Sequence, residues 1–470
     1  MTADPQAPLT AGSWGVLLGR RHLGTVTLLA GAVGLYATNE FLTMSLLPDT
    51  VAEIGGQRLY AWVTTLYLVG SVAAATTVSA VVRRVGPRWA FLGGLAVFAV
   101  GSAICAIAPD MAVLLVGRTV QGTAGGLLAG LGYALINVAL PRPLWTRASA
   151  VVSAMWGVAT LVGPAIGGLF AQFGLWRWAF AAMVALTAAM AALVPLVLPA
   201  ETVTGTVPRL RIPVWSLLLL GTAALAISVA EVPRTAAPTA ALLGAAVVLV
   251  AVFVAVDRRQ SAAVLPPSTF GAGPLKWVYL TMAALMCTAM VDMYVPLFGQ
   301  RLAQLTPVAA GFLGATLAVG WTVSELLSAS LRRRRTIVVA VAAAPLVMAV
   351  GLAMAAMTRA TDAPAVLVAA WVVALLMAGT GIGMAWPHLA AWAMSVVADP
   401  AEGAVAAAAI NTVQLIAAAF GAGLAGVIVN TADNHTAGGD LLAARAVFAM
   451  FAAVALIGVA ASVRASRAAG

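Results

Sequence analysis

The feature that most constrains this chain is a series of apolar stretches, each long enough to cross a lipid bilayer. A membrane-spanning helix needs about 20 apolar residues because each residue adds about 1.5 Å along its axis. Fourteen such stretches follow one another in the 470 residues, in an order of six, two and six. We predict spans at residues 24–47, 59–82, 89–109, 111–139, 148–170, 177–199, 214–232, 237–256, 275–299, 307–331, 336–358, 363–397, 403–430 and 441–463.

The composition favours the same class of protein. The chain is 63% hydrophobic and only 9% charged, and a soluble domain could not expose so much apolar surface to water. The net charge of +10 would also suit a nucleic-acid-binding protein, but the charges lie at the ends of apolar stretches. We therefore expect contact with the lipid bilayer and none with nucleic acid. Cys105 and Cys287 both lie inside apolar stretches, so we predict neither a disulfide nor a metal site.

Basic residues in the connections indicate the orientation, because cytoplasmic loops are enriched in them. With a cytoplasmic N-terminus, eighteen basic residues lie on the cytoplasmic side and six on the other. The six are Arg58, Arg177, Arg234, Arg301, Arg359 and Arg445. We interpret the run Arg332 to Arg335 as a topology anchor rather than a ligand site. Both termini are thus predicted to be cytoplasmic. Lys276 is the only lysine, which is typical of a GC-rich bacterial genome, so the membrane is predicted to be a bacterial inner membrane.

Four parts follow from this pattern. We predict an N-terminal six-helix half at 1–200, two additional helices within 201–256, a cytoplasmic linker at 257–274 and a C-terminal six-helix half at 275–470. The linker is rich in proline, glycine and charge. The chain contains no G-x-x-x-x-G-K-[ST] phosphate loop, which argues against ATP as the energy source.

Several local motifs are more specific than the span count. The fourth span contains LLVGRTVQGTAGG (114–126), the fifth contains WGVATLVGPAIGGLF (156–170), and WRWAF (176–180) follows. In the second half, YVPLFGQRLAQLTPVAAGFL (294–313) and AINTVQLIAAAFGAGLAGVI (409–428) stand out. The fifth span resembles the antiporter signature G-x-x-x-x-x-G-P-x-x-G-G, with Gly157, Gly163, Pro164, Gly167 and Gly168 at its defined positions. Over nearly its whole length the chain resembles the major facilitator superfamily, and within it the fourteen-helix drug:proton antiporters.

This resemblance implies a fold and a function. The fold is all-α, with two six-helix halves and two extra central helices in the membrane. The function is proton-coupled export of hydrophobic or cationic small molecules such as drugs or antibiotics. We expect a monomeric carrier that is not an enzyme and needs no cofactor beyond the proton gradient. A lipid or glycolipid exporter on the same fold, a proton-coupled uptake carrier and a non-transporting membrane protein remain alternatives.

The Gly-Pro stretch also has a physical interpretation of its own. Small residues at helical spacing let two helix backbones approach closely. Pro164 removes one backbone hydrogen bond and can kink the helix. A tight, kinked helix against the other half would suit a sliding contact or a seal. Ordinary small-residue packing is the alternative.

The connection between the second and third spans departs from the family pattern G-x-x-x-D-R-x-G-R-[RK]. In SAVVRRVGPR (79–88), Ser79 replaces the glycine and Arg83 replaces the aspartate. The matching positions are Arg84, Gly86 and Arg88. Asp399 or Glu402 could contact Arg83 with swapped polarity, but we favour a role for both acids in capping the helix that follows them.

Four ionisable side chains are clear cases of a charge inside a predicted span: Glu40, Arg118, Asp292 and Glu325. Each costs roughly 2.5–3.5 kcal/mol on insertion scales and so needs a reason. Helix rise places the first three about 10–12 Å from the outer ends of their spans. Glu40 and Asp292 occupy matching places in the first helix of each half, so a pseudo-twofold axis would face both toward a central cavity.

We predict that Glu40 and Asp292 couple transport to protons, with Glu325 as a further candidate and Arg118 as the charge partner. Burial penalises an ionised carboxylate and a nearby arginine favours it, so a changing cavity can change its proton occupancy. A static Glu40–Arg118 pair between helices one and four is the alternative. For Glu325 we slightly favour pairing with Arg332. His388 is interpreted as structural and Glu231 as interfacial.

The predicted substrate cavity contains side chains that flank the two acids. These are Asn39, Phe41, Met44, Met293 and Tyr294. An apolar, deformable surface with one or two carboxylates suits amphipathic, often cationic, molecules. Packing in the core or against lipid is the alternative for each of these residues.

Overall fold

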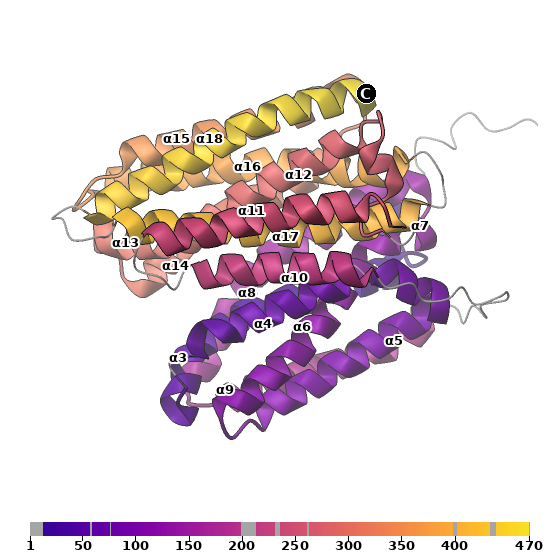
Figure 1. Ribbon diagram of the computed structural model, residues 1–470, viewed down its shortest axis with the longest axis horizontal. Helices are drawn as coiled ribbons and strands as arrows, with labels where there is room; N and C mark the ends of the chain where they lie inside the picture. The colour runs from indigo at the N-terminus through magenta and orange to yellow at the C-terminus, as the bar shows by residue number, and fades with distance from the viewer. Residues whose placement is uncertain are drawn as a thin grey trace, which may run out of the picture. The chain divides into compact units, whose positions relative to one another are not determined.

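The computed structural model describes residues 13–56, 59–75, 77–198, 213–230, 236–260, 263–397, 402–432 and 439–469. These residues form helices and short connections (Figure 1). The first part of the chain contains α2 (Trp14–Leu17), α3 (Leu23–Ile54), α4 (Tyr60–Ala75), α5 (Val78–Ala106), α6 (Met111–Ala134), α7 (Ile136–Ala139), the 3-10 helix η2 (Arg142–Leu144), α8 (Trp145–Gln172) and α9 (Trp176–Val197). The remainder contains α10 (Val214–Ala230), α11 (Ala236–Asp257), η3 (Pro267–Phe270), α12 (Leu275–Ala289), η4 (Met290–Tyr294), α13 (Val295–Ala303), α14 (Pro307–Ser328), α15 (Arg334–Thr358), α16 (Ala365–Ser395), α17 (Gly403–Ala432) and α18 (Gly439–Ala469).

The long helices are apolar enough to lie in a membrane. Within the described ranges, 11 helices have the length and composition to cross a bilayer, and Trp62–Ala75 and Val214–Ile227 are shorter apolar helices. Helical structure is present in every predicted span. The all-helical, multi-pass membrane architecture is therefore confirmed, whereas the number of crossings stays a prediction.

The described helices pack into two compact units. The first comprises Met1–Gly221, Ala255–Pro266 and Val397–Thr412. The second comprises Thr222–Val254, Pro267–Val396 and Val413–Gly470. Helices α3 to α9 thus belong wholly to the first unit, and α12 to α16 and α18 to the second, whereas α10, α11 and α17 are divided by the unit boundaries.

The same helix pairings recur in both units. In the first unit α6 packs between α4 and α5, and α9 packs against α5 and α3. In the second unit α16 packs between α14 and α15, and α18 packs against α15 and α12; Figure 1 shows α15 and α18 side by side. The packing of α3, α4, α5, α6 and α9 in the first unit is therefore repeated by α12, α14, α15, α16 and α18 in the second.

The second and third predicted spans meet at Gly86. Helix α5 extends from Val78 to Ala106, but its helical geometry is interrupted at Gly86, where φ is +78° and ψ is +162°. Residues with a Cβ atom rarely adopt this backbone conformation. The next residue is Pro87, which also disfavours a continuous helix. The matching glycine of the 79–88 motif is thus the residue at which the chain turns.

The predicted span at 275–299 is not one continuous α-helix. Its α-helix α12 ends at Ala289, the 3-10 helix η4 covers Met290–Tyr294, and α13 begins at Val295 with a proline in its first turn. Asp292 lies within η4, so the uniform helix rise assumed for its depth is wrong. Glu40, by contrast, lies within the unbroken α3.

The predicted linker begins at a carboxylate that organises it. Asp257, the last residue of α11, accepts a hydrogen bond from Ser216 at the start of α10 over 2.9 Å. It also accepts from the backbone N–H groups of Val264 and Leu265, at 2.9 and 3.0 Å. These bonds tie the beginning of the linker to both additional helices.

Candidate functional site

A buried polar network in the first unit centres on Arg118 of α6. Its Nη1 donates to Oε1 of Gln121, one turn away, over 2.8 Å. Its Nε donates to the carbonyl of Val63 on α4 over 3.3 Å, and its guanidinium lies 4.0 Å from the ring centroid of Tyr67. The side chains of Arg118 and Gln121 are fully buried. The buried charge of Arg118, which was predicted to lie inside the bilayer, is therefore stabilised by polar neighbours on α4 and α6.

Gln121 extends this network to the neighbouring helices. Its Nε2 donates to Ser102 of α5 over 2.8 Å and to Oδ1 of Asn39 on α3 over 3.4 Å. Asn39 directly precedes Glu40 in the sequence. The network thus connects α6, α4 and α5 to the turn of α3 that carries the candidate proton site.

Glu40 is buried beside this network. Its Oε2 atom has no hydrogen-bond partner among the described residues, whereas the charge of Arg118 acts on it. Nη1 and Nε of Arg118 donate to Gln121 and Val63 and not to Glu40, whereas the alternative of a static pair requires Arg118 to bond to Glu40. A buried carboxylate with a free oxygen near a fixed positive charge can exist with or without a proton.

Aromatic side chains cover the same region of α3. Tyr36 stacks on Tyr67 with ring centroids 5.3 Å apart and meets Trp156 of α8 edge-on at 5.6 Å. The Tyr67 hydroxyl donates to the carbonyl of Tyr36 over 2.8 Å. These contacts fix α3 against α4 and α8 one turn before Glu40.

The Gly-Pro signature brings α8 against α3 within the first unit. A Cβ atom at Gly163 would lie 2.6 Å from Cβ of Phe41, and one at Gly167 would lie 2.7 Å from the carbonyl oxygen of Leu42. The close contact of Gly163 and Gly167 is therefore with α3 of the same unit, and the predicted contact with the other half stays a prediction. A Cβ atom at Gly168 would meet nothing within 4 Å. Gly157 and Pro164 lie on the same helix, α8.

The second unit places the other predicted acids in different surroundings. Asp292 is half-buried, and its Oδ1 atom has no hydrogen-bond partner among the described residues. Glu325 is fully buried on α14, and its pairing with Arg332 stays a prediction. His388 of α16 lies 3.1 Å from both the hydroxyl and the carbonyl oxygen of Ser328, which supports its structural interpretation.

The residues predicted to line a substrate cavity differ in exposure. Asn39 is buried in the polar network, Phe41 and Met44 are half-buried, Met293 is 53% exposed and Tyr294 is half-buried, with its ring 6.4 Å from that of Phe298. In the 79–88 motif, Arg83 and Arg84 are exposed and Arg88 is half-buried. Asp399 and Glu231 lie outside the described residues, and the capping roles of Asp399 and Glu402 stay predictions.

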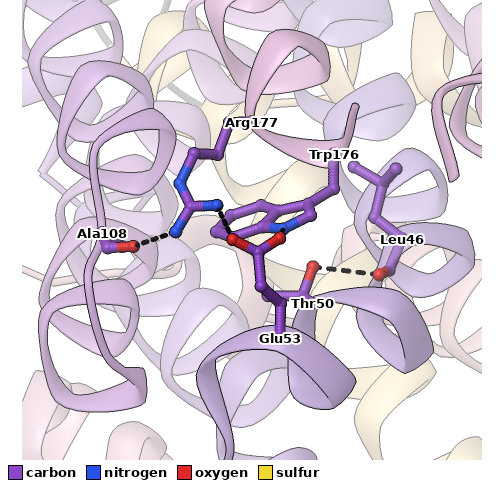
Figure 2. Close-up of polar contacts among 6 residues, drawn as sticks. All are labelled: Leu46, Thr50, Glu53, Ala108, Trp176 and Arg177. Atoms are coloured by element: carbon purple, nitrogen blue, oxygen red, sulfur yellow. Dashed lines mark hydrogen bonds and ion pairs between the residues drawn. The ribbon is translucent and has the colours of Figure 1, made fainter. Parts of the chain in front are cut away.

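A second polar cluster joins the ends of three helices in the first unit (Figure 2). Glu53, near the end of α3, forms an ion pair with Arg177 and accepts a hydrogen bond from Nε1 of Trp176 over 2.6 Å. Arg177 also donates to the carbonyl of Ala108, in the α5–α6 connection, over 3.0 Å. We call Glu53, Trp176, Arg177 and Ala108 the first-unit clasp.

The second unit has a corresponding cluster with the charges exchanged. Arg301, at the end of α13, donates to Asp440 at the start of α18 over 2.6 Å. Arg445 of α18 donates to the carbonyl of Arg359, in the α15–α16 connection, over 2.9 Å. The acid lies on the first helix of the first unit but on the last helix of the second. We call Arg301, Asp440, Arg445 and Arg359 the second-unit clasp.

Sequence reasoning missed most of the residues that complete these clusters. Gln121 was visible only as part of the V-Q-G motif, and Trp176 and Arg177 only as the start of WRWAF. Ser102, Tyr67 and Glu53 carry no local signal, because their roles depend on which helices pack together. A buried amide three residues after a buried arginine is the one pattern that could have indicated the network.

Comparison with known proteins agrees with this architecture. The family model described as Major Facilitator Superfamily matches residues 29–422. A relative from Mycobacterium tuberculosis, named a probable multidrug-efflux transporter, is 65% identical over 97% of each chain. An uncharacterised MFS-type transporter of the same species is 28% identical over 92% of this chain and 64% of its own length.

The fold is also similar to a solved structure. The human organic anion transporter MFSD10 (TETRAN) superposes with a TM-score of 0.68, covering 94% of this chain and 99% of that one, at 15% identity. At that identity the likeness concerns the fold alone. The family model, which spans most of the sequence, and the relative at 65% identity show that this chain belongs to the Major Facilitator Superfamily of membrane transporters.

Proposed function

We propose that this transporter is a proton-coupled antiporter that exports hydrophobic or cationic small molecules such as drugs. The observation that carries the proposal is the environment of Glu40, a buried carboxylate with a free oxygen beside Arg118. A carrier needs an acid that can gain and lose a proton during its cycle. The polar network holds Arg118 in place through other partners and leaves Glu40 free to do so.

The export direction rests on the Gly-Pro signature and on the relative at 65% identity, whose name describes multidrug efflux. Gly163 and Gly167 bring α8 into backbone contact with α3 just after Glu40. A change at Glu40 can thus be transmitted to α8 through direct packing. Asp292 and Glu325 are the second and third candidate proton sites.

The proposed membrane arrangement has fourteen crossings, with both termini in the cytoplasm of a bacterium and the protein acting as a monomer in its inner membrane. The excess of basic residues on one set of connections supports this orientation. It places both clasps at the outer surface. A reporter fused after Arg467 should be detected in the cytoplasm, and an external signal would overturn the arrangement.

Transport in proteoliposomes tests the function. An imposed proton gradient should drive accumulation of a fluorescent lipophilic cation, and a protonophore should abolish it. A fluorescent phospholipid serves as the competing substrate and would reveal a lipid exporter if it alone moved. Absence of gradient-driven movement for every substrate, with folded protein in the vesicles, would contradict proton-coupled export.

A further inference from the structure

Arg359 of the second-unit clasp has a buried guanidinium group that makes no hydrogen bond to the other residues of the clasp. Its side chain is 0% exposed. The ring of Trp371 (α16) lies 4.0 Å from its guanidinium, and that of Phe448 (α18) lies at 4.4 Å. Only the backbone carbonyl of Arg359 takes part in the clasp, as an acceptor for Arg445.

The donors of this guanidinium are unsatisfied. Nε, Nη1 and Nη2 of Arg359 have no hydrogen-bond partner among the described residues. The acid of the clasp, Asp440, is already bound to Arg301. Because Arg445 bonds to Arg359 as well, the clasp contains three guanidinium groups and one carboxylate. Within the clasp, positive charges therefore outnumber negative ones.

The first unit shows that the clasp does not require such a side chain. There the corresponding carbonyl belongs to Ala108, which has no charge to bury. Leaving hydrogen-bond donors of a charged group unpaired in the interior is strongly unfavourable. Arg359 is thus an addition to the shared arrangement, and its unpaired donors point to a ligand.

The chemistry of the group indicates which ligand. The aromatic rings lie near the guanidinium and do not accept its N–H groups in conventional hydrogen bonds. These N–H donors lie in one plane, and two of them can bind two oxygens of one phosphate. Met357 and Val366, at the adjoining ends of α15 and α16, are 82% and 73% exposed, as expected for side chains in contact with lipid. We propose that Arg359 binds a phosphate oxyanion, supplied by a phospholipid headgroup or by free phosphate. The proposal concerns a site separate from Glu40 and does not depend on the transport direction.

Binding can be measured on the purified full-length chain in detergent. Native mass spectrometry would quantify retention of phosphatidylglycerol, with diacylglycerol as the phosphate-free lipid and inorganic phosphate as the free anion. The parent should retain phosphatidylglycerol or phosphate but not diacylglycerol. Arg359→Gln should weaken binding about tenfold or more, since it loses charge-assisted hydrogen bonds. Arg177→Gln, in the first-unit clasp, is the matched control and should bind as the parent does.

The two sources give different results. Binding of phosphatidylglycerol alone assigns the site to a lipid, and equal competition by inorganic phosphate assigns it to the free anion. Arg359→Lys retains the charge without the planar fork and should bind at an intermediate level, which keeps the test informative if the glutamine variant does not fold. Failure of the parent to bind either phosphate compound, or equal binding by parent and Arg359→Gln, would overturn the proposal.

Discussion

Nε2 of Gln121 on α6 donates a hydrogen bond to Oδ1 of Asn39 on α3 over 3.4 Å. Because Gln121 also accepts from Arg118, this bond connects the buried arginine to the residue beside Glu40. The positive charge is thereby fixed through an amide rather than through the carboxylate. Glu40 can change its protonation state without releasing Arg118, and this is the central feature of the proposed coupling.

Replacing the amide should therefore weaken the first unit. Gln121→Leu removes the acceptor for Arg118 and the donor to Ser102, leaving buried polar groups unpaired. We expect destabilisation of roughly 1–3 kcal/mol, measured as a lower temperature of unfolding in detergent. Thr119→Ala, an exposed position on the same helix whose hydroxyl bonds only within its own helix, is the control and should change little. Equal stability of Gln121→Leu and parent would show that the network contributes nothing.

The contact between α8 and α3 should be required for transport. In Gly163→Leu the new side chain would begin 2.6 Å from Cβ of Phe41, so the helices must separate, at a cost of roughly 1–3 kcal/mol. We expect efflux to be abolished while the protein still inserts. Gly168→Leu is the matched control, because that position faces open space, and it should retain efflux. Full efflux by Gly163→Leu at normal expression would refute the role.

The fold was largely predictable because each membrane helix is encoded by a long apolar stretch. Helical structure appears in each predicted span, and Gly86 marks the turn between the second and third. The break at Met290–Tyr294 was not predictable, since neither Asp292 nor its neighbours are helix breakers and Pro296 follows only after it. At the site, buried charge identified Glu40 and Arg118. Their separate partners could not be foreseen, because Val63, Gln121 and Ser102 come together only when α4, α5 and α6 pack.

The stability that the first-unit clasp contributes should depend on pH. Hydrogen bonds from Arg177, and next from Trp176, lower the pKa of Glu53, which lies beyond the predicted span 24–47. A lowered folded-state pKa means that the stabilisation is present above the unfolded value, about 4.3, and is lost as the pH falls through the folded value. Glu53→Gln should thus be less stable than the parent at neutral pH, and the difference should shrink below about pH 4. Unfolding temperatures of the parent and Glu53→Gln, measured from neutral pH to below about pH 4, test this. A difference between the two proteins that does not change with pH would contradict the role of the Glu53 carboxylate.

A double substitution separates coupling from static pairing. If Glu40 and Arg118 served only to neutralise one another, removing both charges would restore what either single change loses. We expect instead that the variant with Arg118→Ala and Glu40→Gln stays inactive in proton-driven efflux, because no group remains to carry the proton. Efflux at the parent level in this double variant would favour the static pair.

Proton release on substrate binding tests the account most directly. The purified parent in weakly buffered detergent should release protons when a transported cation is added, because binding and protonation compete. Glu40→Gln retains shape and hydrogen bonding but cannot titrate, so it should release fewer protons while still binding some substrate. Asp292→Asn should weaken cation transport or change the coupling. If Glu40→Gln and Asp292→Asn each release as many protons as the parent, neither acid is the carrier, and Glu325 becomes the candidate.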